Sequence, residues 1–401
     1  MEYTKLGNTD ITISKLCLGC MSFGDRASQM HAWTLNLQDS EAIIKHALDL
    51  GINFFDTANC YSAGTSEEYL GRAIKRNAAR DKVVLASKVY FNDGHLSKEA
   101  IQREMTAPCA ASARSILILY IIHRLRITVT PMEETMEALD SLVKAGKVRA
   151  LGASAMYGYQ FYNMQLAAER NGWTPFSSMQ NHYSLLYRED ERELIPICSQ
   201  MNVSLTSYSP LAAGRLARPE WKADTLRSQT DKVAVEKYDS TQVMDSRIVK
   251  QVQDIAAEHG ATMTQIALAW QFAKGVASPI IGATKMSYLD DAAGAFDVTL
   301  TEDDMARLEQ FYLPHKVVGA STKASRRRRC WRPTLGRKGG GWHGPAGIFE
   351  MDRSRALTLF LSGCGNILTR AESASGIVGG GKPMNIVVVT GSLIERERRM
   401  Y

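Results

Sequence analysis

The sequence predicts an α/β fold, a (β/α)8 TIM barrel with an N-terminal β-hairpin and a basic C-terminal tail. Within the first 320 residues, short apolar runs alternate with amphipathic stretches of helical periodicity. Strands that alternate with helices form parallel sheets with helical crossovers. The stretch after the first core strand, Gly-Cys-Met-Ser-Phe-Gly at 19–24, lacks the G-x-G-x-x-G spacing of a doubly wound dinucleotide domain. Eight units in about 300 residues therefore favour a closed barrel.

The elements are predicted in order from these patterns. Residues 3–6 and 11–14 read as a hairpin that precedes the barrel. The eight core strands are expected at 15–18, 52–55, 83–86, 116–122, 148–151, 176–179, 203–206 and 278–281. Helices are expected between them, for example at 40–50, 66–75, 132–145 and 160–170. Gly51, Gly146 and Gly172 follow three of these helices closely, where a left-handed helix end favours glycine.

Composition limits the classes to which the chain can belong. Of its 401 residues, 45% are hydrophobic and 22% charged, which allows a large core and excludes wholesale disorder. No apolar run approaches the roughly 18 residues of a membrane span, and the N-terminus lacks a secretory signal pattern. Seven cysteines are too few for a disulfide scaffold in so long a chain. We therefore expect a cytoplasmic protein with no membrane partner.

The charge distribution divides the chain into two parts. Residues 321–401 contain 15 of the 48 lysines and arginines, only five of the 42 acidic residues, and 13 of the 30 glycines. We therefore predict a barrel over residues 1–319 and a basic, glycine-rich, poorly ordered extension over 320–401. Residues 386–389 are strand-like but have no evident partner. Despite its charge, we do not expect this tail to bind nucleic acid.

Polar side chains recur where the predicted strands end. In a barrel, the carboxyl ends of the strands share one mouth, where active sites form. The spacing between these residues is close to one strand–helix unit, so we expect them to converge there. They are Asp56, Lys88, His123, Ser154, Gln180 and Tyr208.

Several motifs around these positions resemble the aldo-keto reductase family over about residues 1–319. They are Phe-Phe-Asp-Thr-Ala-Asn-Cys-Tyr-Ser at 54–62, Ser-Lys-Val at 87–89, Ile-Ile-His-Arg at 121–124, Lys-Ala-Gly-Lys-Val-Arg at 144–149, Gly-Ala-Ser at 152–154, Gln180, Tyr-Ser-Pro-Leu-Ala-Ala-Gly-Arg-Leu at 208–216 and Pro-Ile-Ile-Gly-Ala-Thr at 279–284. The resemblance implies a (β/α)8 barrel that reduces an aldehyde or ketone with NADPH, which becomes NADP+.

The resemblance also implies a catalytic tetrad, Asp56, Tyr61, Lys88 and His123. A carbonyl accepts hydride readily only if its oxygen is protonated or held by a strong donor. Tyr61 is expected to give the proton, although a phenol with a pKa near 10 is a poor acid at neutral pH. We expect the Lys88 ammonium to lower the pKa of Tyr61, Asp56 to hold Lys88 charged, and His123 to position the carbonyl oxygen.

On the cofactor side, the resemblance implies that Ser154 and Gln180 bind the nicotinamide carboxamide and that Tyr208 stacks on the ring. The start of the helix after Gly282 suits the adenosine 2′-phosphate, because a helix N-terminus and Lys285 both favour an anion. The family often has Gln and Asn where this chain has Tyr288 and Ala292. The other implied cofactor-binding residues are Ser209, Leu211, Gly214, Gly282, Thr284, Tyr288 and Asp291.

The resemblance fails between residues 102 and 130 and in the tail 320–401. Pro108 lies where a helix is expected, and proline removes a backbone donor there. We interpret this segment as a local reading-frame slip in the gene or as a natural variant helix. Two other interpretations therefore stand beside the reductase: an NADPH-binding regulatory barrel, like the β-subunits of channels, and an inactive product of a frame-disrupted gene.

Remaining signals concern metals and specificity. Cys17 and Cys20 have C-x-x-C spacing but no second pair, so we expect a core position and no metal site. Substrate specificity is expected to come from the loops at 25–37 and 215–244. In these loops Trp33 and Trp221 are either pocket-lining side chains or packing anchors. The sequence leaves the substrate and the oligomeric state open.

Overall fold

Eight parallel strands form one sheet, as the apolar runs predict. The computed structural model describes residues 1–28, 30–106, 117–125, 130–221 and 225–318, and the backbone of 372–376 and 384–388. The sheet order is β10-β3-β4-β5-β6-β7-β8-β9, so every chain-consecutive pair from β3 to β9 is adjacent. The strands are β3 (Cys17–Gly19), β4 (Phe54–Asp56), β5 (Val84–Val89), β6 (Leu117–Ile122), β7 (Val148–Ser154), β8 (Phe176–Gln180), β9 (Ser204–Leu205) and β10 (Ile280–Gly282).

The two ends of this sheet meet along a seam between β9 and β10. The amides of Ala277 and Ser278 donate to the Leu205 carbonyl at 3.0 and 3.3 Å, and the Ile280 amide donates to Ser207 at 2.8 Å. A parallel bridge between Tyr208 and Ile280 continues the pairing. These bonds close the sheet into the predicted (β/α)8 barrel.

The N-terminal hairpin packs beneath the barrel interior. β1 (Tyr3–Lys5) and β2 (Thr12–Ser14) pair antiparallel, as predicted. Leu6, Ile11 and Ile13 are buried in one cluster with inward-facing strand residues such as Phe54 and Leu119. Because no helix contributes to this cluster, it is the interior of the barrel, and the hairpin fills one end of it.

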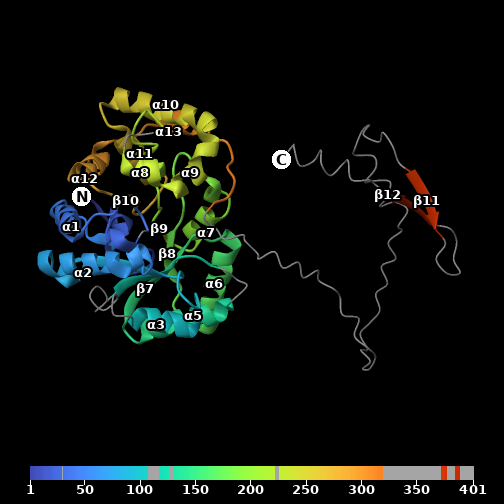
Figure 1. Ribbon diagram of the computed structural model, residues 1–401, viewed down its shortest axis with the longest axis horizontal. Coiled ribbons are helices and arrows are strands. Elements are labelled where there is room, and N and C mark those ends of the chain that lie inside the picture. Colours follow the sequence, from blue (N-terminus) through green and yellow to red (C-terminus); the bar gives the residue numbers. More distant parts are fainter. Residues whose placement is uncertain are drawn as a thin grey trace. The chain divides into compact units, whose positions relative to one another are not determined.

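Helices surround the strands and bury an apolar face against them (Figure 1). The four helices whose ranges were predicted from the sequence correspond to α1 (Leu37–Asp49), α2 (Thr65–Asn77), α5 (Met132–Lys144) and α6 (Gly158–Asn171). The others in the barrel are α3 (Lys98–Thr106), α7 (Leu194–Gln200), α10 (Gln242–His259), α11 (Met263–Ala273), α12 (Met286–Ala293) and α13 (Glu302–Glu309). Two short helices, α8 (Leu226–Thr230) and α9 (Lys232–Tyr238), lie in the long connection after β9.

Helix ends and helix packing follow the sequence signals. Gly146 and Gly172 have φ values of 68° and 64°, the left-handed conformation in which glycine ends a helix.

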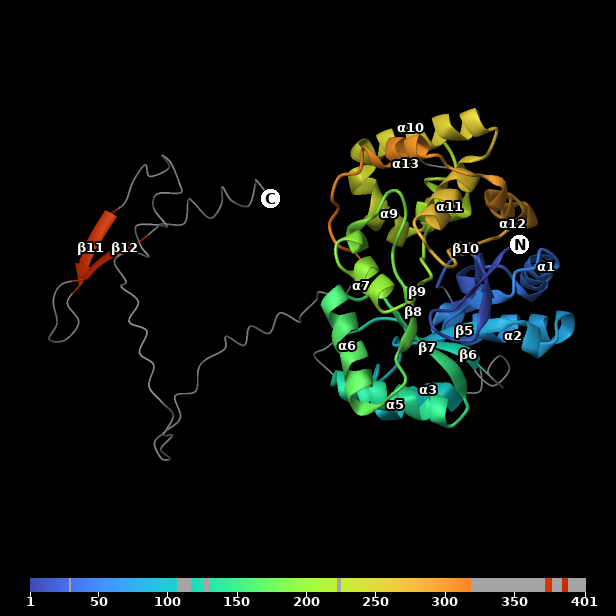
Figure 2. The same cartoon turned by 180° about the vertical axis from the view of Figure 1, so that it is seen from behind.

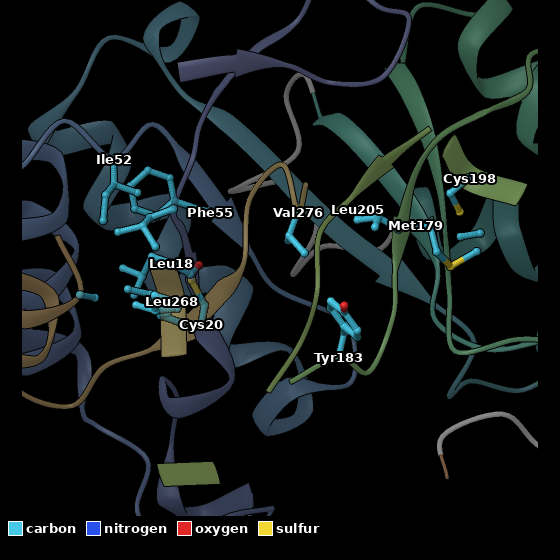
Figure 3. Packing of buried hydrophobic residues seen from close by; sticks show 14 of the residues in the cluster. Leu18, Cys20, Ile52, Phe55, Met179, Tyr183, Cys198, Leu205, Leu268 and Val276 are labelled. Carbon is cyan, nitrogen blue, oxygen red and sulfur yellow. Dashed lines mark hydrogen bonds between the residues drawn. The ribbon is translucent and has the colours of Figure 1, made fainter. Parts of the chain in front are cut away.

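Both views place α10, α11, α12 and α13 together, whereas α3, α5 and α6 lie at the opposite side of the barrel (Figures 1 and 2). Between the strands and helices lies a second apolar cluster, in which Leu18, Ile52 and Phe55 pack together (Figure 3).

The chain divides into two units, Met1–Arg327 and Arg328–Tyr401. In the second unit, β11 (Glu372–Gly376) and β12 (Met384–Val388) pair antiparallel. The expectation that the run at 386–389 has no partner was therefore wrong. The partner, Glu-Ser-Ala-Ser-Gly, consists of small and polar residues whose pattern does not indicate a strand.

Part of the segment that departs from the family pattern is described. Helix α3 ends at Thr106. Strand β6 begins at Leu117, and His123 comes directly after its last residue. Pro108 and residues 126–129 lie outside the described residues.

None of the helices that the structure describes combines the length and the apolar character needed to cross a bilayer.

Candidate active site

The alternation of side chains along each strand carries the predicted tetrad into the barrel. Phe54 and Ala86 belong to the interior cluster, so Asp56 and Lys88, two residues further on, face the interior as well. In the same way, Ile121 faces inward and His123 follows it at the carboxyl end of β6. Parallel pairing of β4, β5 and β6 in adjacent positions then brings these strand ends to one rim.

Asp56, Lys88 and Tyr61 form a connected hydrogen-bond network at this rim. Lys88 Nζ donates to a carboxylate oxygen of Asp56, to the Thr57 carbonyl at 2.8 Å and to Tyr61 Oη at 3.3 Å. The Lys88 and Asp56 side chains are 0% and 4% exposed. Because the ammonium has three oxygen acceptors, it can remain charged away from water.

The backbone after Tyr61 is held in a rare conformation. Ser62 and Ala63 have φ values of 46° and 54°, the left-handed region that side chains with a Cβ seldom occupy. The Ser62 amide donates to Met30 Sδ at 3.0 Å, and the Thr65 hydroxyl donates to the Ser62 carbonyl at 2.7 Å. These two contacts fix the turn that presents the Tyr61 phenol to Lys88.

Burial dominates the proton affinity of the site. It raises the pKa of Tyr61 to about 12, although the Lys88 ammonium acts in the opposite direction. The Lys88 ammonium lowers the pKa of Tyr61 as expected, but the loss of water outweighs the lysine, so the pKa lies above the ordinary value of a phenol. Burial would lower the pKa of Lys88, but the Asp56 carboxylate and Tyr61 raise it above its ordinary value. The lysine is thus an ammonium at neutral pH.

His123 lies beside the phenol in a mainly aromatic setting. Its ring meets the Tyr61 ring edge-on at 5.9 Å and the Phe91 ring edge-on at 5.0 Å between centroids. Burial and the nearby Lys88 and Arg124 cations hold the pKa of His123 well below its usual range, so the imidazole is neutral. Cys60 Sγ lies 4.0 Å from His123 Nδ1, and burial raises the pKa of this thiol to about 11.

The tetrad opens onto a cavity of about 1010 Å³ at the rim of the barrel. This volume is at the upper end of the range for pockets that enclose small ligands. Asp56, Tyr61 and His123 line it, and Lys88 lies behind them. All the residues that the sequence assigns to the cofactor line the same cavity, namely Ser154, Gln180, Tyr208, Ser209, Leu211, Gly214, Gly282, Thr284, Lys285, Tyr288 and Asp291.

Ser154 and Gln180 are paired positions at the carboxyl ends of β7 and β8. Gln180 Nε2 donates to the second carboxylate oxygen of Asp56 at 2.8 Å, so this amide also supports the tetrad. That contact was not expected from the sequence, because residues 56 and 180 are 124 positions apart. Tyr208 stacks on His182 at 5.1 Å with an interplanar angle of 7°, which fixes the plane of its ring.

The loop after Tyr208 and the start of α12 form the rest of this wall. Ser209, Ala212, Ala213 and Gly214 all have positive φ values, between 47° and 90°, so this loop is tightly folded. Lys285 precedes the first residue of α12, and its Nζ lies 5.8 Å from the centroid of the Tyr288 ring. Asp291 accepts a hydrogen bond from the Thr262 hydroxyl at 2.6 Å.

The cavity wall is positively charged, which the sequence did not predict. Among the described residues, six cations line it against three carboxylates. Each of those carboxylates already has a partner: Asp56 pairs with Lys88, Asp231 with Arg227, and Asp291 with Thr262. Five of the cations had no assigned role, and they are Arg26, Arg124, Arg218, Arg227 and Lys237. They lie in loops or in a short helix, where no periodic pattern indicates which side chains face inward.

The two loops expected to set specificity both contribute to the wall. Trp33 lines the cavity and stacks on His31 at 4.2 Å. Trp221 instead donates from its indole nitrogen to Asp239 at 3.1 Å and is buried. Cys17 and Cys20 are both buried free thiols. In the part of the chain that the structure describes, no three His, Cys, Asp or Glu side chains are grouped as metal ligands.

Comparisons with known proteins agree with this architecture. The model of the aldo/keto reductase family matches residues 15–313. Versiconal hemiacetal acetate reductase of Aspergillus parasiticus is 37% identical over 343 residues, which cover 79% of this chain and 98% of that protein. Aldo-keto reductases of Fusarium vanettenii and Alternaria alternata are each 38% identical, over 80% and 77% of this chain and 94% and 91% of their own lengths. The protein belongs to the aldo/keto reductase family.

Proposed function

We propose that the protein reduces an aldehyde or ketone to an alcohol with NADPH, with Tyr61 as the proton donor. The observation that carries this proposal is the contact between Lys88 Nζ and Tyr61 Oη, 3.3 Å, at the wall of a cationic cavity. When bound, the reduced nicotinamide supplies the hydride. The chain supplies the acid, the site that holds the carbonyl oxygen, and the exclusion of water.

Each member of the tetrad has one task in this proposal. Tyr61 is protonated at neutral pH, so it can donate its proton to the oxygen on which negative charge develops. The Lys88 ammonium then stabilises the phenolate that remains, and Asp56 keeps that ammonium in place. His123, as a neutral imidazole, offers an N–H to the same carbonyl oxygen.

The other cavity residues fit a large anionic cofactor. We assign the nicotinamide carboxamide to Ser154 and to Gln180 Oε1, since the Gln180 amide nitrogen is used by Asp56. Tyr208 would stack on the nicotinamide ring, and Ser209, Leu211 and Gly214 would hold the phosphates. Gly282, Thr284, Lys285, Tyr288 and Asp291, which line the same cavity, would hold the adenosine and its 2′-phosphate. The surplus of cations supports NADPH, because its phosphates need partners.

Substitution of Tyr61 by Phe tests the proposal. This change removes the proton donor and little volume, so kcat with an aromatic aldehyde is expected to fall by about 100-fold or more. The dissociation constant for NADPH, measured by fluorescence, should stay the same because the phenol does not hold the cofactor. Tyr69→Phe, on α2 outside the cavity, is the control and should retain full activity. Equal loss of turnover and of NADPH affinity in Tyr61→Phe would contradict the assigned role.

Activity, NADPH binding and thermal unfolding of the wild-type protein together distinguish the reductase from the two other interpretations. A wild-type chain that binds NADPH but turns over no aldehyde is the result expected of a regulatory barrel. A chain without a cooperative melting transition that NADPH shifts upward is the result expected of a disrupted gene product. A cytoplasmic location is supported by four free thiols among the described residues, Cys17, Cys20, Cys60 and Cys198.

A further inference from the structure

We propose that His182 is a positioning residue for the nicotinamide, because it holds the Tyr208 ring in the plane on which this end of the cofactor stacks. This inference rests on the proposed function, which places the nicotinamide against Tyr208, and it adds a residue to that site. The two side chains come from neighbouring strand ends. His182 lies two residues after β8, and Tyr208 lies three residues after β9.

The backbone places these two side chains next to each other. His182 and Tyr208 form a parallel bridge, and the Tyr208 amide donates to the Asn181 carbonyl at 2.8 Å. A second bridge joins Tyr208 to Ile280, so the backbone of Tyr208 is held on both sides. Paired positions project their side chains to the same face of a sheet. The backbone therefore fixes the root of the Tyr208 ring, but not its rotation about χ2, which is a soft torsion.

A stack of three rings supplies the missing restraint. The His182 ring lies nearly parallel to the Tyr208 ring, at 5.1 Å and 7°, and to the Tyr187 ring, at 4.2 Å and 16°. Tyr208 is half-buried and lines the cavity, whereas His182 is 3% exposed. The imidazole therefore supports the phenol ring from the protein interior. Rotation of the Tyr208 ring out of this plane would lose the stacked contact.

The imidazole is itself held in place. Its Nε2 lies 2.7 Å from Tyr238 Oη, and the Tyr238 ring meets it edge-on at 5.8 Å. Tyr238 is on α9 and also lines the cavity. Burial above all holds the pKa of His182 well below its usual range, so the ring is neutral and carries one N–H. His182 cannot turn without breaking the bond to Tyr238 or separating the stacked rings.

The effect of this support is expected at one end of the cofactor. Hydride transfer requires the nicotinamide to lie close to the carbonyl carbon in a defined orientation, and a shift of about 1 Å lowers the rate strongly. Lys285 and Asp291, which we assign to the adenosine end, lie at the start of α12 and within it. That helix is a different element from those that form the stack. Loss of the stack should therefore weaken NADPH binding through the nicotinamide alone.

His182→Gln tests the stack, because the amide can still bond to Tyr238 Oη but has no ring. In calorimetry this variant is expected to bind NADPH about five- to tenfold more weakly than the wild type. It should bind 2′-phospho-ADP-ribose, which is NADP+ without its nicotinamide, with unchanged affinity. The rate of NADPH oxidation in a single turnover with an aromatic aldehyde should fall by about tenfold or more.

Three further variants complete the design. His182→Phe restores a planar ring and should bind NADPH within about twofold of the wild type. His259→Gln is the matched control, because this histidine bonds to Asp304 and lies outside the cavity. It should leave both dissociation constants unchanged. If His182→Gln does not fold, His182→Leu takes its place with the same expected results.

The proposal is overturned if His182→Gln binds NADPH as the wild type does, or if His182→Phe binds it as weakly as His182→Gln. It is also overturned if NADPH and 2′-phospho-ADP-ribose are weakened equally, because the histidine would then support the fold and not the nicotinamide.

Failure of the proposed function gives a different result. A wild-type protein that binds NADPH but reduces no aldehyde refutes the reductase, whereas a selective loss of NADPH affinity in His182→Gln still supports the positioning role. A wild-type protein that reduces the aldehyde, with unchanged NADPH affinity in His182→Gln, keeps the reductase and refutes this inference. A wild-type protein that binds no NADPH refutes both.

Discussion

At the scale of single residues, the site depends on a buried charge whose partners are all within the protein. Lys88 has an acidic, a carbonyl and a phenolic acceptor, and Asp56 receives a second donor from Gln180. A buried ion pair of this kind contributes little net stability compared with apolar residues, but removal of one partner leaves the other charge unpaired. The network therefore specifies the position of Tyr61 at the expense of tolerance to substitution.

Lys88→Met should lower the free energy of unfolding by about 3 to 5 kcal/mol, because it leaves the Asp56 carboxylate buried with the Gln180 amide as its one side-chain donor among the described residues. Urea unfolding followed by tryptophan fluorescence measures this change. The double variant Asp56→Asn with Lys88→Met should recover part of the loss, since it removes the stranded charge. A double variant no more stable than Lys88→Met would refute this account.

At the scale of elements, the last residues of the barrel domain hold the loop that follows β8. The Val318 amide donates to Tyr187 Oη at 3.1 Å, and the His315 amide donates to Glu189 at 2.7 Å. Tyr187 stacks on His182 at 4.2 Å, and His182 stacks on Tyr208 in turn. The segment after α13 is therefore connected through two stacked rings to an aromatic wall of the cavity.

His315 gives this segment a pH dependence. Its Nε2 lies 3.0 Å from Asp245, and its Nδ1 lies 2.6 Å from the Leu313 carbonyl, so both ring nitrogens can donate when the ring is charged. Burial lowers the pKa of His315, but Asp245 outweighs burial and raises it. Because the folded pKa lies above the unfolded value, the stabilisation is complete below pH about 6.5 and is lost as the pH rises through the folded pKa.

His315→Gln should therefore cost about 1 to 2 kcal/mol in acid and much less in base. The measurement is urea unfolding of both proteins at pH about 5.5 and about 9, on either side of the ordinary histidine value. Titration of the other histidines cancels in the difference between the two proteins. A difference that stays constant with pH would show that the imidazolium does not act in this way.

At the scale of the whole molecule, the sequence predicts the elements that have a periodic apolar pattern. It does not predict side-chain contacts between distant strands or in irregular loops. The eight strands, the hairpin and the convergence of Asp56, Lys88 and His123 follow from apolar runs and from polar residues at strand ends, whereas Tyr61 was assigned from the family resemblance. Gln180 was placed near the site, but its bond to Asp56 was not expected, because pairing of side chains from distant strands leaves no local signal. Lys237 and Arg218 lie in an irregular connection, and the raised pKa of Tyr61 depends on how deeply the chain buries it.

All the residues of the proposed cofactor site belong to the unit Met1–Arg327, so the basic tail should not be needed for cofactor binding. A chain ended at Gly319 is expected to bind NADPH with the same dissociation constant as the full chain in a fluorescence titration. NADH should bind about tenfold more weakly or worse to both, since it lacks the 2′-phosphate that cations such as Lys285 can hold. Weaker NADPH binding by the shortened chain would assign the tail a part in the site.

The barrel closes through few bonds, because β9 contains only two residues and its contact with β10 is limited to the amides of 277, 278 and 280 and one bridge. By comparison, strands β5, β6 and β7, which are adjacent to one another elsewhere in the sheet, are each six or seven residues long. In the native protein, the hydrogen bonds between β9 and β10 should therefore open by local fluctuation more readily than the rest of the barrel unfolds. Tyr208 lies at this junction, so a ligand that stacks on its ring would contact both sides of the junction and would oppose its opening.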